Sequence, residues 1–152
     1  MTPVLTLLKI LYNPIVFPTL AAYFASLVLK LIIGSWQKKR LTFRAVLKDG
    51  GMPSSHTAFV IGLASAIFLY EGTTTVFWLS VAFAFIVMRD AVSVRYETGQ
   101  QGKAINKIVK KLSLDLKGKH LKELVGHTPL QVIAGIILGI LVSSGTYMAL
   151  FV

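Results

Sequence analysis

The sequence predicts an all-α integral membrane protein, a bundle of about four transmembrane helices. The 152-residue chain is 55% hydrophobic, and its mean hydropathy of +0.71 lies above the balance of a soluble domain. Its apolar residues gather in four stretches near the ~20 residues that a helix needs to cross a bilayer. Helices are expected because open strands leave backbone groups unsatisfied in lipid. The stretches are 13–36, 55–70, 74–93 and 128–152.

The ends of these stretches follow from local sequence. Residues 3–12 form either a short interfacial helix or an extension of the first span. The second stretch is short for a full crossing, so we expect its helix to begin within the turn 52–56. Three residues, 71–73, connect it to the third. The length allows one domain, 1–152.

The charge pattern predicts the orientation in the membrane. Sixteen Lys and Arg against six Asp and Glu give a net charge of +10. Of these cations, 14 lie in 37–50 and 89–127, and alternation of four spans puts both connections on one side. Because cytoplasmic loops are rich in Lys and Arg, we expect a multi-pass protein with the basic segments 37–50 and 94–127 in the cytoplasm and both termini outside.

The same charge favours an anionic lipid surface over nucleic acid as the partner. Within the basic region, 100–116 combines lysines with apolar residues at mixed helical spacing, which predicts an amphipathic helix lying on the membrane. The chain has no Cys, which excludes a disulfide, a thiolate metal site and a Cys nucleophile. We see no tight set of His, Asp and Glu and expect no metal and no cofactor. Residues 1–9 lack the basic start of a cleavable signal peptide.

Two polar segments with a histidine precede the second and fourth apolar stretches, on the predicted cytoplasmic side. The first is 50–56, Gly-Gly-Met-Pro-Ser-Ser-His. A helix start offers free N–H groups and a positive dipole end, which suit a phosphate. Ser54 and Ser55 can cap the helix and donate to an anion. The alternative is an ordinary helix start with His56 as a polar residue of the interface.

The second segment is 126–131, Gly-His-Thr-Pro-Leu-Gln. Gln131 lies four residues after His127, so its side chain can reach one imidazole nitrogen and fix the tautomer. A capped helix with a polar edge is the alternative. The predicted site would open to the cytoplasm.

Charged residues near the same face complete the candidate set. Arg89 and Asp90 close the third stretch, and they either pair with neighbours or face a polar cavity. Arg95 has the shape for bidentate phosphate binding. Lys30 lies inside the first stretch, where it either snorkels to the interface or faces inward. Two histidines with several cations favour phosphoryl transfer, in which one imidazole attacks phosphorus and the other protonates the leaving oxygen.

Together these motifs resemble the divergent branch of the type 2 phosphatidic acid phosphatase superfamily, related to lipid phosphate phosphatases and vanadium haloperoxidases. The superfamily's Pro-Ser-Gly-His motif reads Pro-Ser-Ser-His at 53–56. The branch's own signatures are similar to 50–56, 89–100 and 126–132. The resemblance runs from about residue 13 to the C-terminus.

The resemblance implies a phosphatase acting on a lipid phosphate or prenyl diphosphate, with His127 as nucleophile and His56 as general acid. It implies phosphate binding by Arg95 with Ser54 and Ser55. The family's orienting Asp is replaced by Gln131, for which Asp90 or Glu123 are candidates to compensate. The first superfamily motif is absent as such, and Lys30, Arg44 and Lys48 are the candidate substitutes; Arg89 is a further candidate for binding phosphate. The superfamily Arg lies close before its His, whereas a long basic insert separates Arg95 from His127.

Three functions remain open at this level. The first is a membrane phosphatase acting on phosphatidylglycerophosphate, phosphatidic acid or a prenyl diphosphate. The second is a non-catalytic membrane protein that binds anionic lipid, which the change from Asp to Gln131 favours. The third is a transporter subunit or channel, since small residues repeat every four positions at 58–66 and 135–139. Such repeats more often pack helices within a bundle, and a homodimer is left open.

Overall fold

The computed structural model describes residues 9, 12–38, 51–113, 121, 123 and 125–152. Within them the chain forms five long helices and no strand, which confirms the predicted all-α bundle. The stretch 3–12 lies largely outside the described residues. The helices are α2 (Val16–Lys38), α4 (Ser55–Glu71), α5 (Thr75–Val92), α6 (Val94–Lys111) and α7 (Pro129–Phe151).

The helix starts follow from the capping residues in the sequence. The hydroxyl of Ser54 accepts a hydrogen bond from the N–H of Thr57 at the start of α4. Thr74 does the same for Phe77 at the start of α5. Pro129 occupies the first turn of α7, where its missing N–H is not needed. These local signals explain why α4, α5 and α7 begin at or next to the first residue of the predicted stretches.

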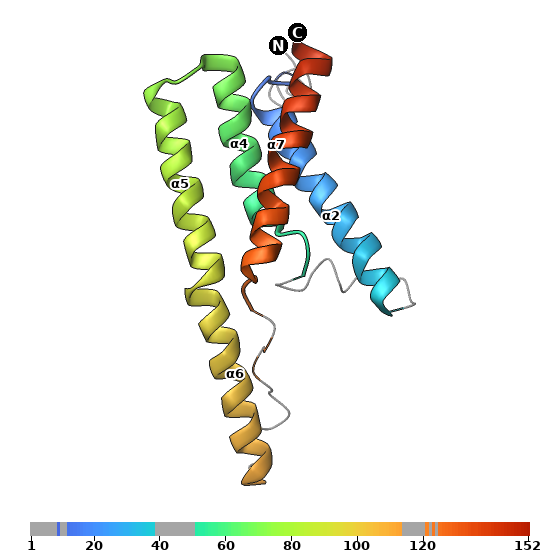
Figure 1. The fold of residues 1–152 in the computed structure, drawn as a ribbon, viewed down its shortest axis with the longest axis vertical. Helices are drawn as coiled ribbons and strands as arrows, with labels where there is room; N and C mark the ends of the chain where they lie inside the picture. The colour runs from blue at the N-terminus through green and yellow to red at the C-terminus, as the bar shows by residue number, and fades with distance from the viewer. Residues whose placement is uncertain (1–8, 10–11, 39–50, 114–120, 122, 124) are drawn as a thin grey trace.

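Helix α4 lies at the centre of the bundle, packed against α7, α2 and α5 (Figure 1). Helices α2 and α7 also pack against each other, so α2, α4 and α7 form the tightest group. Helix α5 contacts α4 and, less extensively, α7. The first turns of α4 and α7 lie at the same end of the bundle, and both histidine segments therefore meet there (Figure 1).

The contact between α4 and α7 depends on glycines. A Cβ on Gly139 would lie 2.8 Å from the carbonyl oxygen of Ala58. Ser143 of α7 donates a 2.8 Å hydrogen bond to the carbonyl oxygen of Gly62 across the same contact. On the side of α4 that faces α2, a Cβ on Gly62 would lie 2.9 Å from the Cβ of Ala22. The small-residue repeats therefore serve helix packing within the bundle. The homodimer remains a prediction.

The surface of the bundle is that of a membrane protein. Three helical segments, Val16–Trp36, Thr75–Lys111 and Pro129–Phe151, are long and apolar enough to cross a bilayer, and α4 is a shorter apolar helix. Large apolar side chains such as Leu79 and Leu141 are mostly exposed on the outside. Small and polar residues fill the inside, as lipid-embedded bundles prefer. The protein is an integral membrane protein with several apolar helices.

Helix α6 departs from the expected orientation. It continues the direction of α5 and extends beyond the other helices, and does not turn across the end of the bundle as a surface helix was expected to do (Figure 1). The returning chain packs along it: a Cβ on Gly99 would lie 2.8 Å from the carbonyl oxygen of Glu123. Asn106 also exchanges hydrogen bonds with the backbone of Leu121, at 2.9 and 3.1 Å. These contacts hold α6 against the segment that returns toward His127. The apolar spacing of the sequence does not reveal them.

Candidate functional site

The first histidine segment is held between α4 and α7. The backbone N–H of Ser54 donates a 3.0 Å hydrogen bond to the carbonyl oxygen of Gln131. The hydroxyl of Ser54 is fully buried and accepts a 2.9 Å hydrogen bond from the hydroxyl of Thr57. Ser55 is buried in the first turn, and His56 follows it with an exposed side chain. The backbone of Ser54 therefore ties the loop to α7, and its hydroxyl is engaged in the helix cap with Thr57.

The second segment is anchored to the junction of α5 and α6. Gly126 has a φ of +85°, which favours glycine. A Cβ on it would collide with the backbone nitrogen of Tyr96. The next residue, His127, donates its backbone N–H to the carbonyl oxygen of Ala91 at 2.9 Å. These two contacts fix the backbone of His127, and the residue is only 5% exposed.

The structure brings the two imidazoles together. The ring centroids of His56 and His127 lie 6.3 Å apart, with the ring planes at 78°. Seventy residues separate them in the chain. The pairing combines a buried imidazole on a fixed backbone with an exposed one at the start of α4. Such a pair can face one ligand from two sides.

Lys30 faces inward. It is only 5% exposed, and its side chain runs along Gly51: the Cε of Lys30 lies 3.8 Å from the position of a Cβ on that glycine. A snorkelling lysine would reach the outer interface, and this one reaches the loop that precedes His56 instead. A cation is thus placed beside the histidine-bearing loop, where an anion would be stabilised.

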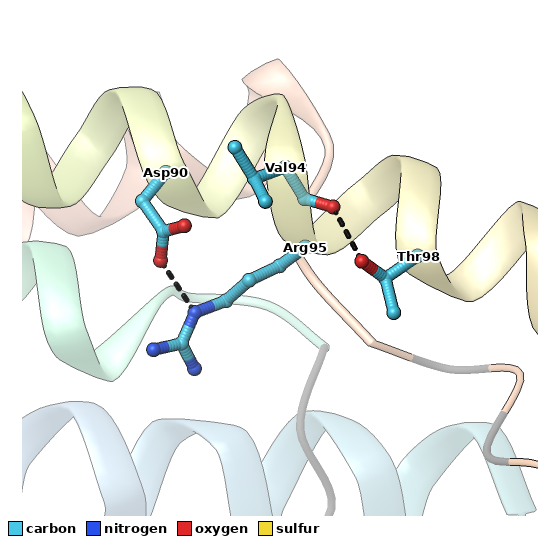
Figure 2. Close-up of polar contacts among 4 residues, drawn as sticks. All are labelled: Asp90, Val94, Arg95 and Thr98. Carbon is cyan, nitrogen blue, oxygen red and sulfur yellow. Dashed lines mark hydrogen bonds and ion pairs between the residues drawn. The ribbon is translucent and has the colours of Figure 1, made fainter.

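Arg95 forms an ion pair with Asp90. Its Nε lies 2.6 Å from the carboxylate Oδ2, and the two side chains, 49% and 40% exposed, point to the same side of the helices (Figure 2). Its two Nη groups take no part in this ion pair, and they are the donors suited to a bidentate contact. Arg89, one residue before Asp90, has an exposed side chain at the end of α5.

The basic insert does not separate Arg95 from the second histidine. A Cβ on Gly126 would lie 2.7 Å from the carbonyl carbon of Arg95. The insert leaves along α6 and returns beside it, so that its two ends meet. The Arg and the His that lie close together in the superfamily sequence therefore lie on neighbouring backbone segments here.

Other candidates lie elsewhere or have another partner. The side-chain oxygen of Gln131 accepts a 3.1 Å hydrogen bond from the N–H of Thr128, which caps α7. Glu123 accepts a 2.9 Å hydrogen bond from the amide of Asn106 on α6. Lys48 and Arg44 lie outside the described residues. No group of three or more His, Cys, Asp or Glu that could hold a metal ion occurs in the part of the chain that the structure describes.

Two residues of this region escaped the sequence analysis. Thr57 completes the cap, and the Ala91 carbonyl holds the His127 backbone. The polar helix start was a visible signal for Thr57. Gly135, a member of the small-residue repeat noted in the sequence, allows the close approach of the two segments, since a Cβ there would lie 2.7 Å from the Ser54 carbonyl oxygen. No sequence signal marks a backbone carbonyl such as that of Ala91.

The fold and these residues define an integral membrane helix bundle with two histidines paired at one end. The chain belongs to the divergent PAP2 family, whose profile matches residues 11–142. It is 35% identical over 150 residues to the uncharacterized membrane protein YuiD of Bacillus subtilis (strain 168), covering 90% of this chain and 95% of the relative. No solved structure matches the chain.

Proposed function

We propose that this protein is a membrane-embedded phosphatase that hydrolyses a lipid phosphate or prenyl diphosphate through a phospho-histidine intermediate. The pairing of His56 and His127 at 6.3 Å is the observation that carries the proposal. Lys30 beside the Gly51 loop and the Nη groups of Arg95 supply positive charge for the phosphate oxygens. Membership of the divergent PAP2 family supports the same class of chemistry.

The proposed first step forms the intermediate. A ring nitrogen of His127 attacks phosphorus, and the bond between phosphorus and the lipid oxygen breaks. Protonated His56 gives its proton to that oxygen, which leaves as a lipid alcohol, or as a prenyl monophosphate when the substrate is a diphosphate. Neutral His56 then removes a proton from water, whose oxygen attacks phosphorus and releases inorganic phosphate from His127.

Burial supports this division of roles. A nucleophile benefits from a fixed position, and His127 is buried on a backbone held at both Gly126 and its own N–H. A general acid must regain its proton in each cycle, and the exposed side chain of His56 can exchange with water. In this proposal Ser55 and Arg89 are additional candidates for contacts with phosphate.

The proposed site faces the cytoplasm. Lysines of α6 and the basic end of α2 lie toward the same end of the bundle as the two histidine segments (Figure 1). The opposite end holds the start of α2 and the end of α7, where the rings of Tyr12 and Phe151 lie 5.2 Å apart. The positive-inside rule then places both chain ends outside.

Phosphate release from a panel of lipid phosphates by the purified protein tests the proposal. We expect His127→Ala to abolish turnover and the trapped phospho-protein, and His56→Ala to slow turnover by about 10²- to 10⁴-fold. His120→Ala is the matched control, because no role is assigned to that histidine. Equal turnover in the parent and both variants would refute the mechanism.

The second candidate is a protein that binds an anionic lipid without turnover. The side-chain oxygen of Gln131 caps α7, which favours this reading because the family carboxylate that would orient the nucleophile is missing. Binding of lipid phosphates with no phosphate release across the panel would select it.

A further inference from the structure

An apolar cavity begins at one of the two histidines. It has a volume of about 380 Å³ and lies between α2, α4 and α5. His56 is the only histidine among its lining residues. In its wall the rings of Tyr23 and Phe59 meet edge-on, with their centroids 5.9 Å apart. The lining residues are Leu20, Tyr23, Phe59, Val60, Phe83 and Val87, together with His56.

The two outer walls of the cavity stand apart. Among the described residues no Cα atom of α2 lies within 8 Å of one of α5, whereas α4 packs against both helices. Phe83 on the α5 wall is 51% exposed. A hydrocarbon chain from the bilayer would therefore enter between α2 and α5.

The cavity residues on α2 lie within about the depth of one leaflet from the histidine loop. The contact between Lys30 and Gly51 marks the level of the histidine loop on α2. Tyr23 and Leu20 lie seven and ten residues before Lys30. At 1.5 Å per residue, these lie about 10 and 15 Å further along α2. The hydrocarbon of one leaflet is about 15 Å thick, half of the bilayer core.

We propose that this cavity holds one hydrocarbon chain of the substrate while its phosphate lies at the histidine pair. This proposal rests on the proposed function, because the two sites share His56. A volume near the lower end of the range for small-molecule pockets, about 300–1,000 Å³, suits one chain and not two. Any second chain of the same lipid stays in the bilayer.

The cavity acts by shape. A chain that moves from lipid into an apolar cavity gains little hydrophobic free energy, since both environments are equally apolar. Its value is in positioning: a chain lying along Val87 and Phe59 directs the bonded phosphate to His56. The proposal therefore predicts selectivity for chain length.

The first test compares two tryptophan substitutions at adjacent positions. Val87→Trp fills the cavity, whereas Ile86→Trp adds the same ring at a position that is 64% exposed on the outside of α5. Hydrolysis is measured for 1-acyl-glycerol 3-phosphates with long and short chains. We expect Val87→Trp to lower the ratio of long-chain to short-chain kcat/KM by about tenfold or more. Ile86→Trp should leave the ratio unchanged.

A second variant covers the case in which the tryptophan disturbs folding. Phe83→Ala removes a half-exposed aromatic ring from the cavity wall. It should also weaken the dependence of kcat/KM on chain length. An unchanged ratio in both Val87→Trp and Phe83→Ala would overturn the cavity proposal and leave the phosphatase proposal standing.

A binding readout separates the two proposals. A single-chain glycerol phosphate with a photoreactive group in its tail should label cavity residues of α2, α4 and α5 in the parent, and monoacylglycerol of equal chain length should not compete. Labelling without phosphate release would support the cavity and reject the phosphatase. Equal labelling of the outer face of α5 around Ile86, or displacement by monoacylglycerol, would reject the cavity as a substrate site.

Discussion

The backbone of Gly126 packs directly against the backbone of Arg95, although thirty residues lie between them in the chain. This contact closes the basic insert at its base. It places the ion pair of Arg95 and Asp90 beside the segment that carries His127. The site therefore depends on a backbone contact as much as on its charged side chains.

Substitution of Gly126 should be costly. Gly126→Ala combines a positive φ with a collision against the backbone of Tyr96. We expect a loss of more than ~2 kcal/mol in the free energy of unfolding and a loss of phosphate release, since the positive φ alone costs about 1–2 kcal/mol. Gly72→Ala is the matched control, because Gly72 has a φ of +73° with nothing within 4 Å of the added Cβ. Equal costs in unfolding titrations would show that the contact contributes nothing.

The buried lysine should matter for phosphate and not only for packing. Lys30→Met keeps most of the buried side-chain volume beside Gly51 and removes the charge. We expect kcat/KM for lipid phosphates to fall by about 10²- to 10³-fold, the usual effect of removing one group that stabilises developing negative charge. Lys103→Met, at an exposed position on α6, is the control. A drop of equal size in Lys103→Met would show that general surface charge is responsible.

The ion pair should contribute little to stability. Both partners are about half exposed, so solvent screening limits its contribution, and we expect Asp90→Asn to cost no more than ~1 kcal/mol of unfolding free energy. Arg95→Lys keeps the charge and loses the fork of the guanidinium, which should raise KM for lipid phosphates about tenfold. An unaltered KM in Arg95→Lys would show that Arg95 does not belong to the proposed phosphate site.

Substitutions of Gln131 can distinguish a role in capping α7 from a role in orienting His127. Gln131→Glu keeps an oxygen for the N–H of Thr128, so the start of α7 should remain stable. Gln131→Ala should cost about 1 kcal/mol by leaving that N–H without its acceptor. If capping is its whole role, turnover of Gln131→Glu measured by phosphate release should equal that of the parent. Lower turnover at unchanged stability would instead indicate an effect on His127.

Much of the fold could be predicted from local sequence. Hydropathy located the four apolar helices, and Ser54, named from the sequence as a capping residue, marks where α4 begins. Both signals act within a few residues of the chain, so they survive without knowledge of the neighbours. The direction of α6 was missed because it depends on the returning segment, whose contacts at Gly99 and Asn106 are distant in sequence.

The candidate site was only partly predictable. The sequence by itself determined a membrane helix bundle and two histidine-bearing helix starts, because hydropathy and caps are properties of short segments. The tertiary structure alone decided that Lys30 points inward and that Arg95 meets Gly126. It also decided that an apolar cavity starts at His56. Each of these is a relation between helices, set by the close packing that their glycines and alanines allow, and no local pattern specifies which faces will meet.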